Sequence, residues 1–242
     1  MEPVRTHRAK SVVDAARLHR SRERRERGLT LVEGPHLIAD VEASGAVIRA
    51  RFGIEPATPG VTPVDQKALE RLAGTESPRG PVAVVEIPGE RLDRSRNLLV
   101  SVGVSDPGNV GTMIRTAAAF DWGFAYTEGT ADPWAPKTIR AGAAGQFQTP
   151  VSAIGSVEEL SGWTTVATVV TGGDSPESVH GRPVALMIGE EAHGLPEQVT
   201  AAATHRITIP TPGPTESLNA AVAAGIIVHA LVKGSGEPRA DV

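Results

Sequence analysis

The chain of 242 residues contains no cysteine, and aromatic residues make up only 3% of it. The absence of cysteine excludes disulfides, thiolate metal sites, iron–sulfur clusters and thiol nucleophiles. The scarcity of aromatic side chains argues against a binding surface built on stacked rings, which many single-strand binders use. With 40% hydrophobic residues, the chain is nevertheless long and apolar enough to bury a core.

Long apolar runs and the common catalytic motifs are also missing. The longest apolar stretch, Ala220 to Val232, has 13 residues, whereas a bilayer span needs about 20, so we expect a core helix and no membrane span. The charged N-terminus shows no secretory signal, and we expect a cytoplasmic protein. The sequence has no Walker A loop, G-x-G-x-x-G, H-E-x-x-H or G-x-S-x-G, and its seven histidines lack metal-ligand spacing. We therefore expect no bound metal.

Positive charge gathers at the N-terminus, although the whole chain has a net charge of −4. Against four acidic residues, the first 30 residues carry nine basic ones: Arg5, Arg8, Lys10, Arg17, Arg20, Arg22, Arg24, Arg25 and Arg27. A basic arm on an acidic body is typical of polyanion binding, and a solvated charged helix gives the same pattern.

The order of the expected elements predicts two α/β domains. Residues 1–88 form a small domain that begins with a helix over Arg8–Arg27, ended by Gly28, and residues 89–96 form a polar linker. Residues 97–233 alternate between strands and helices, which predicts a parallel sheet covered on both faces, and residues 234–242 form a frayed tail. The strands expected in this second domain are Leu98–Val104, Gly123–Tyr126, Val151–Ile154, Thr165–Val170, Val184–Ile188 and Arg206–Ile209; its helices are Asn109–Asp121, Ser156–Leu160, Pro196–Ala203 and Ser217–Lys233.

Three segments of the second domain carry polar side chains next to strand ends or helix starts. In the first, the apolar stripe of the helix after Asn109 leaves Arg115 pointing away from the core, and Asn109 itself fits a helix cap. In the second, Gly189 permits close backbone approach and Glu191 offers a carboxylate at a strand end, a place where ligands bind; a tight turn with solvated carboxylates fits equally. The third runs from Ile209-Pro210 to Ser217-Leu218-Asn219.

The third segment leads into the last helix. Ser217 is a good N-cap, whereas Asn219 within a first helical turn is a poor helix former, a local conflict that hints at function. The helix that follows is apolar nearly all round, so we expect it to be buried or to lie at a subunit interface. We expect His229 to be a core histidine rather than a ligand.

Together these segments resemble the SpoU (TrmH-type) family of RNA ribose 2′-O-methyltransferases, within the SPOUT superfamily. The match covers residues 96–232: Asn109 and Arg115 lie six residues apart, Gly189, Glu191 and Gly194 fit G-x-E-x-x-G, and I-P followed by S-L-N completes the third motif. Residues 33–38 and 80–85 are similar to the substrate-binding domain that precedes the catalytic domain in many members. The chain departs from the family at Gly142, where a serine is usual, which puts a role for that position in doubt.

The resemblance implies a deep trefoil knot in the C-terminal domain, S-adenosylmethionine as methyl donor, and a homodimer formed through that domain. It implies that the backbone of Gly189, Ile209 and Leu218 holds the cofactor. It also implies that Arg115 acts on the ribose hydroxyl, and that the other catalytic side chains shape the site, namely Asn109, Glu191, Ser217 and Asn219.

Methyl transfer to a ribose hydroxyl needs alignment of the two reactants and loss of one proton, but no metal and no thiol. Because the pKa of arginine lies above about 12, our hypothesis is that Arg115 stays charged, pairs with a phosphate and stabilises the developing alkoxide; proton abstraction by a neutral arginine is the alternative. We expect 23S ribosomal RNA as substrate. Transfer RNA, a drug-resistance modification and an inert RNA-binding relative are the alternatives, and the target nucleotide is not encoded in any motif.

Overall fold

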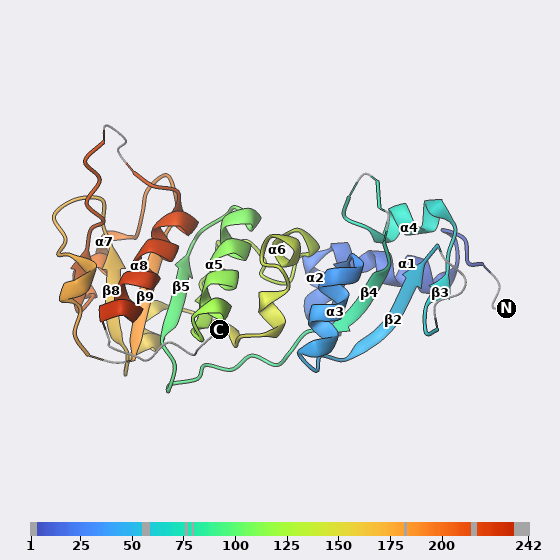
Figure 1. Cartoon of the computed structure of the whole chain (residues 1–242), viewed down its shortest axis with the longest axis horizontal. Helices are drawn as coiled ribbons and strands as arrows, with labels where there is room; N and C mark the ends of the chain where they lie inside the picture. The colour runs from blue at the N-terminus through green and yellow to red at the C-terminus, as the bar shows by residue number, and fades with distance from the viewer. Residues whose placement is uncertain are drawn as a thin grey trace. The chain divides into compact units, whose positions relative to one another are not determined.

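The computed structural model describes residues 4–54, 59–75, 77–78, 80–181, 183–213 and 217–234. The chain divides into two compact units (Figure 1): Met1–Gly89 with Asp132–Gln148, and Glu90–Ala131 with Thr149–Val242. The predicted division into residues 1–88 and 97–233 therefore differs in one segment, because Asp132–Gln148 packs with the first unit. Of the tail predicted to fray, residues 235–242 lie outside the described part.

The first unit is built on a four-stranded sheet in the order β1-β4-β2-β3, with antiparallel pairs except for β2 and β3. Val12 and Leu18 from the N-terminal helices pack with Leu69 and Leu72 in its apolar core. In chain order its elements are α1 (Lys10–Ala16), η1 (Arg17–His19), α2 (Ser21–Arg27), β1 (Leu29–Glu33), α3 (Pro35–Ala43), β2 (Ile48–Gly53), β3 (Thr62–Pro63), α4 (Gln66–Leu72), β4 (Val82–Glu86), α6 (Pro136–Ala141) and η2 (Gly145–Phe147).

The N-terminal helix is interrupted, so the prediction of one continuous helix over Arg8–Arg27 is wrong. The chain passes through a 3₁₀ turn and becomes extended at Arg20, where ψ is 129°, before α2 begins at Ser21. The break lets Leu18 be fully buried. The predicted stop at Gly28 is confirmed, because this residue ends α2 in the left-handed conformation with φ of 61°.

Arg24 ties the segment Asp132–Gln148 to the first unit. Its guanidinium is almost fully buried, pairs with the carboxylate of Asp132 and donates to the carbonyl oxygens of Leu18 and His19 at 2.7 and 2.9 Å. The hydroxyl of Thr30 donates to the carbonyl oxygen of Trp134 at 2.6 Å. A buried guanidinium is tolerated only with such partners, so the pair explains why this segment leaves the second unit.

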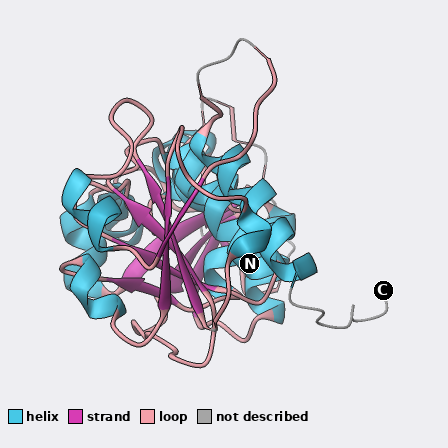
Figure 2. Cartoon of the chain, turned by 90° about the vertical axis from the view of Figure 1, so that its left-hand side faces the viewer, coloured by secondary structure: helices cyan, strands magenta, loops and turns pink. Residues whose placement is uncertain are grey.

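The second unit is a six-stranded sheet in the order β10-β8-β9-β5-β6-β7, and every neighbouring pair is parallel, as predicted. Helices lie on both sides of the strands (Figure 2). In chain order its elements are β5 (Leu98–Val102), α5 (Pro107–Ala119), β6 (Gly123–Tyr126), β7 (Val151–Ala153), η3 (Val157–Leu160), β8 (Thr164–Thr168), η4 (Pro176–Ser178), β9 (Val184–Gly189), α7 (Glu197–Ala202), β10 (His205–Ile207) and α8 (Ala220–Gly234).

Both faces of this sheet are covered, which explains its continuous apolar strands. On one face Val100 and Met187 pack with Leu160 and Trp163. Helices α5 and α8 pack against each other and on β5 and β9, and the predicted stripe of α5 is buried. Within the described residues, no helix is both long and apolar enough to cross a membrane.

We predict that Arg24→Ala lowers the free energy of unfolding by about 3 kcal/mol, because it leaves the Asp132 carboxylate without its partner. Urea denaturation would measure the change. Arg25→Ala is the matched control, since Arg25 lies next to it in α2 and is exposed, and we expect a change within about 0.5 kcal/mol. Equal effects of the two substitutions would show that the pair contributes nothing specific.

Candidate functional site at the strand ends

The strand order reverses between β5 and β9. From β5 the chain continues to β6 on one side, and from β9 it continues to β10 on the other side of the sheet. In open parallel sheets the crevice beyond the carboxyl ends at such a point is where ligands bind. The loop after β5 leads to Asn109 in α5, and the loop after β9 carries Glu191. Two of the predicted residues therefore follow the two strands that flank the point of reversal.

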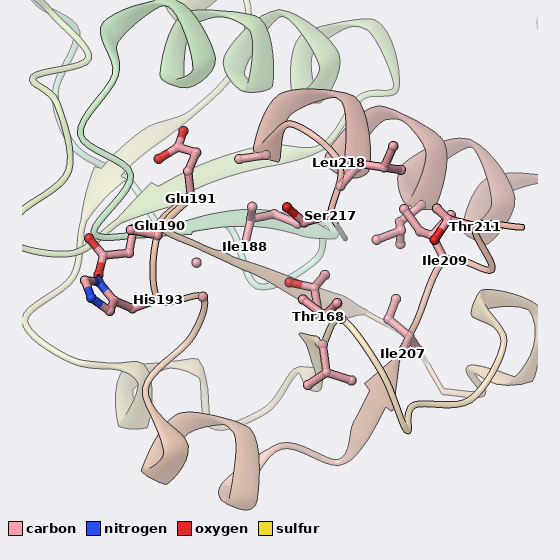
Figure 3. A pocket seen from close by; sticks show the side chains of 18 residues that line it. Thr168, Ile188, Glu190, Glu191, His193, Ile207, Ile209, Thr211, Ser217 and Leu218 are labelled. Carbon is pink, nitrogen blue, oxygen red and sulfur yellow. Dashed lines mark hydrogen bonds and ion pairs between the residues drawn. The ribbon is translucent and has the colours of Figure 1, made fainter. Parts of the chain in front are cut away.

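A pocket of about 440 Å³ lies beyond the carboxyl ends of β8, β9 and β10 and next to the start of α8. Figure 3 shows isoleucine, leucine and threonine side chains around it, with Glu190, Glu191 and His193 along one side. Its described lining includes two carboxylates and no lysine or arginine. The size suits a small-molecule ligand, and the composition favours one with an apolar part and positive charge.

Gly189 lets two parts of the chain touch beside this pocket. A Cβ atom at this position would collide with the backbone of Gly194 and Leu195. The loop between the two glycines closes through a hydrogen bond from the Gly194 amide to the Glu190 carbonyl oxygen at 2.9 Å. The backbone therefore requires both glycines, Gly189 because of this close approach and Gly194 because of its φ of +69°, and the turn between them places Glu191 at the edge of the pocket.

Three polar side chains from distant parts of the second unit form one hydrogen-bonded chain. The amino group of Asn219 donates to the amide oxygen of Asn109 at 2.9 Å, and the amino group of Asn109 donates to the carboxylate of Glu191. Asn109 is free for this role because Asp106 caps α5, accepting from the Asn109 backbone amide at 2.8 Å. The suggestion that Asn109 is the helix cap is thus wrong.

Asn219 is the N-cap of α8. Its amide oxygen accepts from the backbone amides of Ala221 and Val222 at 3.0 and 3.2 Å, and the helix begins at Ala220. The predictions that the helix starts at Ser217 and that Ser217 caps it are therefore wrong. Because the oxygen of Asn219 is held by the helix, its amino group must face Asn109. Asn219, which is a poor helix former, is therefore the residue that orients Asn109 and, through it, Glu191.

Arg115 does not join this hydrogen-bonded chain within one copy of the protein. It lies six residues after Asn109, which on an α-helix places the two side chains about 120° apart. Its side chain is exposed, as predicted, and has no hydrogen-bond or ion-pair partner among the residues that the structure describes. The guanidinium of Arg115 is therefore open to a ligand or to another protein chain.

The remaining predicted residues, Gly189, Ile209, Ser217 and Leu218, all line the pocket. The end of β8 was not among the predicted site residues, yet Thr168, Val169 and Val170 complete the wall there. The rule that ligands sit at the carboxyl ends of parallel strands could have found them, since that strand was predicted.

The prediction of a core histidine at His229 is wrong. The side chain is exposed and lies edge-on to the ring of Phe120, with centroids 6.3 Å apart. The expectation failed because α8 is apolar nearly all round, so composition alone does not tell its exposed face from its buried one.

A parallel sheet with a pocket at its strand ends and three polar motifs beside it defines a ligand-binding α/β unit, and the comparisons with known proteins identify its family. The model of the SpoU rRNA Methylase family matches residues 96–229. The 23S rRNA (guanosine(2553)-2′-O)-methyltransferase RlmP of Bacillus subtilis is 30% identical over 248 residues, covering 96% of this chain and 99% of the relative. The chain belongs to the SpoU rRNA Methylase family.

Solved structures share the architecture. The SpoU methyltransferase AviRb from Streptomyces viridochromogenes, in complex with the cofactor AdoMet, matches with a TM-score of 0.83 and 25% identity over 96% of this chain and 100% of that chain. A structure concerned with 2-OH methylation of C/U34 on tRNA matches with a TM-score of 0.54 and 29% identity, covering 59% of this chain and 98% of that chain. The first match therefore includes most of both units, whereas the second leaves about two fifths of this chain unmatched.

Substitutions at Asn219 should separate capping from orientation. Asn219→Ala removes both functions and should lower the free energy of unfolding by about 1 kcal/mol. Asn219→Ser keeps a capping oxygen, so we expect a change below about 0.5 kcal/mol, yet it loses the donor that reaches Asn109. Urea denaturation of both variants measures the difference. A loss of stability with Ser as large as with Ala would show that the side chain does not act as a cap.

Proposed function

We propose that the protein is an S-adenosylmethionine-dependent methyltransferase that methylates a ribose 2′-hydroxyl of 23S ribosomal RNA in the cytoplasm. The observation that carries the proposal is the hydrogen-bonded chain Asn219–Asn109–Glu191, which joins the three motifs that carry the family resemblance and ends at a carboxylate on the edge of the pocket. Two similar proteins support the substrate and the cofactor: a 23S rRNA 2′-O-methyltransferase and an AdoMet-bound SpoU methyltransferase.

The pocket residues suit S-adenosylmethionine. Ile188, Ile209 and Leu218 offer an apolar surface for an adenine ring, and the backbone of Gly189, Ile209 and Leu218 supplies the hydrogen-bonding groups that would hold it. Glu190 and Glu191 give the edge a negative charge that favours a cationic ligand. When bound, the cofactor supplies a methyl group already activated by its positive sulfonium, so the protein need not provide a metal.

The polar side chains then have to position the ribose. Because the carboxylate of Glu191 accepts from Asn109 on one side, its remaining acceptor sites are directed by that bond and can hold a sugar hydroxyl. Ser217 adds a further hydroxyl on the pocket wall. Fixing the attacking oxygen in this way lowers the barrier through alignment, which can contribute roughly 7–11 kcal/mol in well-oriented reactions.

Arg115 completes the site from a second copy of the chain. Its exposed guanidinium has no partner among the described residues. Helix α8, which packs against α5, exposes Val222 and Ile226, one turn apart, at 51% and 43%. An apolar stripe of this kind favours a protein interface. In the homodimer that we propose, Arg115 stays charged and pairs with a phosphate beside the target ribose. It stabilises the negative charge that develops on the 2′-oxygen as this oxygen bonds to the methyl group and its proton passes to solvent.

The proposal also covers the topology of the second unit and the separate roles of the two units in catalysis and RNA binding. A deep trefoil knot in the second unit is proposed from the family resemblance, which membership of the SpoU rRNA Methylase family supports. The basic first unit binds the ribosomal RNA.

Transfer RNA is the alternative substrate. The solved structure concerned with tRNA covers 59% of this chain, whereas the 23S rRNA methyltransferase covers 96%. Because the tRNA-related protein lacks a large part of the chain that the rRNA relative matches, the comparison favours ribosomal RNA.

Incubation of the protein with labelled S-adenosylmethionine and total RNA tests the function directly. We expect label in 23S RNA at a single alkali-resistant position, because 2′-O-methylation protects the neighbouring phosphodiester bond from cleavage by alkali. Label in transfer RNA would favour the alternative substrate. Calorimetric titration with the cofactor supplies the decisive control: an absence of both label and cofactor binding would make the protein an inert RNA-binding relative.

We predict that Arg115→Ala lowers the rate of methyl transfer at least 100-fold, the size expected when a group that stabilises transition-state charge is removed. Cofactor affinity and the dimer, measured by calorimetry and sedimentation, should change little. Loss of the dimer instead would make Arg115 structural.

Arg115→Lys, assayed across pH, distinguishes the two roles of the side chain. A charged stabiliser predicts partial activity with a pH profile like that of the wild type, whereas a profile that follows the lower lysine pKa would favour proton abstraction.

A further inference from the structure

A second cavity lies in the first unit, outside the site described above. It has a volume of about 430 Å³ and is lined by Val13 and Ala16 of α1, Arg17, Arg20, and Arg71 of α4. Val13 and Ala16 are half-buried and form an apolar floor, while the three arginines are exposed around it. None of these residues takes part in the methyl-transfer site.

The local backbone explains why two of the arginines face the same cavity. Arg17 opens the 3₁₀ turn after α1, and Arg20 follows it three residues later. In a 3₁₀ helix residues three apart lie above one another. Arg20 ends this turn, and its backbone amide donates to the carbonyl oxygen of Arg17 at 2.9 Å. The turn keeps the two residues close together, and both line the cavity.

These charges are poorly compensated within the protein. Arg20 has no side-chain partner among the described residues, and Arg17 reaches Asp14 at 3.7 Å, with the two side chains 55% and 36% exposed. Arg71 donates to the carbonyl oxygen of His7 at 2.8 Å, which fixes its position without neutralising it. Three like charges around one cavity repel one another, and an anion bound between them would relieve that repulsion.

The combination of an apolar floor and a guanidinium rim fits a nucleotide. Guanidinium groups bind phosphate oxygens in pairs and stack on the faces of bases, and unpaired RNA bases are recognised by such stacking. The scarcity of aromatic residues in this chain leaves arginine as the main stacking group. The cavity volume lies in the range of small-ligand sites.

We propose that this cavity anchors an unpaired nucleotide of the substrate RNA, with its phosphate on Arg17, Arg20 and Arg71 and its base on Val13 and Ala16. The proposal rests on the proposed function for the identity of the polyanion. It adds a site that selects unpaired over paired RNA, at a place in the fold separate from the methyl-transfer pocket.

The test compares two triple variants of the full-length protein with equal reduction of charge. Arg17, Arg20 and Arg71 are each replaced by Gln in the cavity variant; Arg8, Arg22 and Arg25, exposed on the same unit and outside the cavity lining, are each replaced by Gln in the control. Binding of a labelled 12-nucleotide single-stranded RNA is measured by fluorescence anisotropy at several salt concentrations. Cofactor affinity is measured by calorimetry.

We expect the cavity variant to bind the RNA about 30-fold more weakly than the wild type, and the control less than threefold more weakly. The slope of log K against log salt should fall by about 0.7 for each phosphate that the cavity variant no longer neutralises, and cofactor affinity should stay unchanged. Equal weakening by both variants would overturn the proposal, because the cavity would then act only through net charge. Unchanged binding in the cavity variant would overturn it as well.

A variant without charge change tests the apolar floor. Ala16→Gln narrows the cavity, so it should weaken single-stranded RNA binding more than binding of a duplex with the same number of phosphates. Equal effects on the two would contradict a base-binding floor. A polyglutamate peptide that competes as well as RNA at equal charge would show an acidic protein partner instead, which also contradicts the proposal.

The methyl-transfer assay separates this proposal from the proposed function. If the wild type labels RNA, and the cavity variant binds and labels RNA as well as the control variant does, the result supports the methyltransferase activity and contradicts the nucleotide anchor. If the wild type labels no RNA but binds RNA through the cavity arginines, the result supports the nucleotide anchor and contradicts the methyltransferase activity.

Discussion

The hydrogen bonds between Asn219, Asn109 and Glu191 hold together three parts of the chain that are far apart in sequence. Their direction is set by the backbone of α8: its first amides occupy the oxygen of Asn219, which leaves only the amino group for Asn109. Asn109 then has its own amino group left for the carboxylate of Glu191. A helix terminus thus fixes two amide orientations and one carboxylate. The same three segments contain or adjoin the wall of the pocket, so the orientation of these side chains and the shape of the pocket depend on each other.

The pocket at the strand ends and the cavity in the first unit have opposite electrostatic character. The pocket has carboxylates and no lysine or arginine in its described lining, which suits a cationic methyl donor. The cavity in the first unit has an arginine rim, which suits a phosphate. Each therefore disfavours the ligand of the other. Arg115 is exposed on α5 and lines neither of them, so in the proposed homodimer it brings positive charge to the ribose without weakening cofactor binding.

Much of this organisation could be predicted from the sequence, because buried parallel strands and helix stripes leave strong periodic signals. The all-parallel sheet, the outward Arg115 and the stop at Gly28 are confirmed. The cap of α8 was placed at Ser217, since propensity does not show which of two polar residues a loop presents to the helix amides. The packing of Asp132–Gln148 on the first unit depends on the buried pair of Arg24 with a residue 108 positions away, and no local pattern reports such a contact.

A double-mutant cycle on methyl transfer tests the central claim, that Asn109 acts by orienting Glu191. The values of kcat/KM are compared for the wild type, Asn109→Ala, Glu191→Ala and the double variant. If the two side chains work as one unit, the double variant falls no lower than the more damaging single variant. Effects that multiply as for independent residues would contradict the claim, because Glu191 would then keep its role without Asn109.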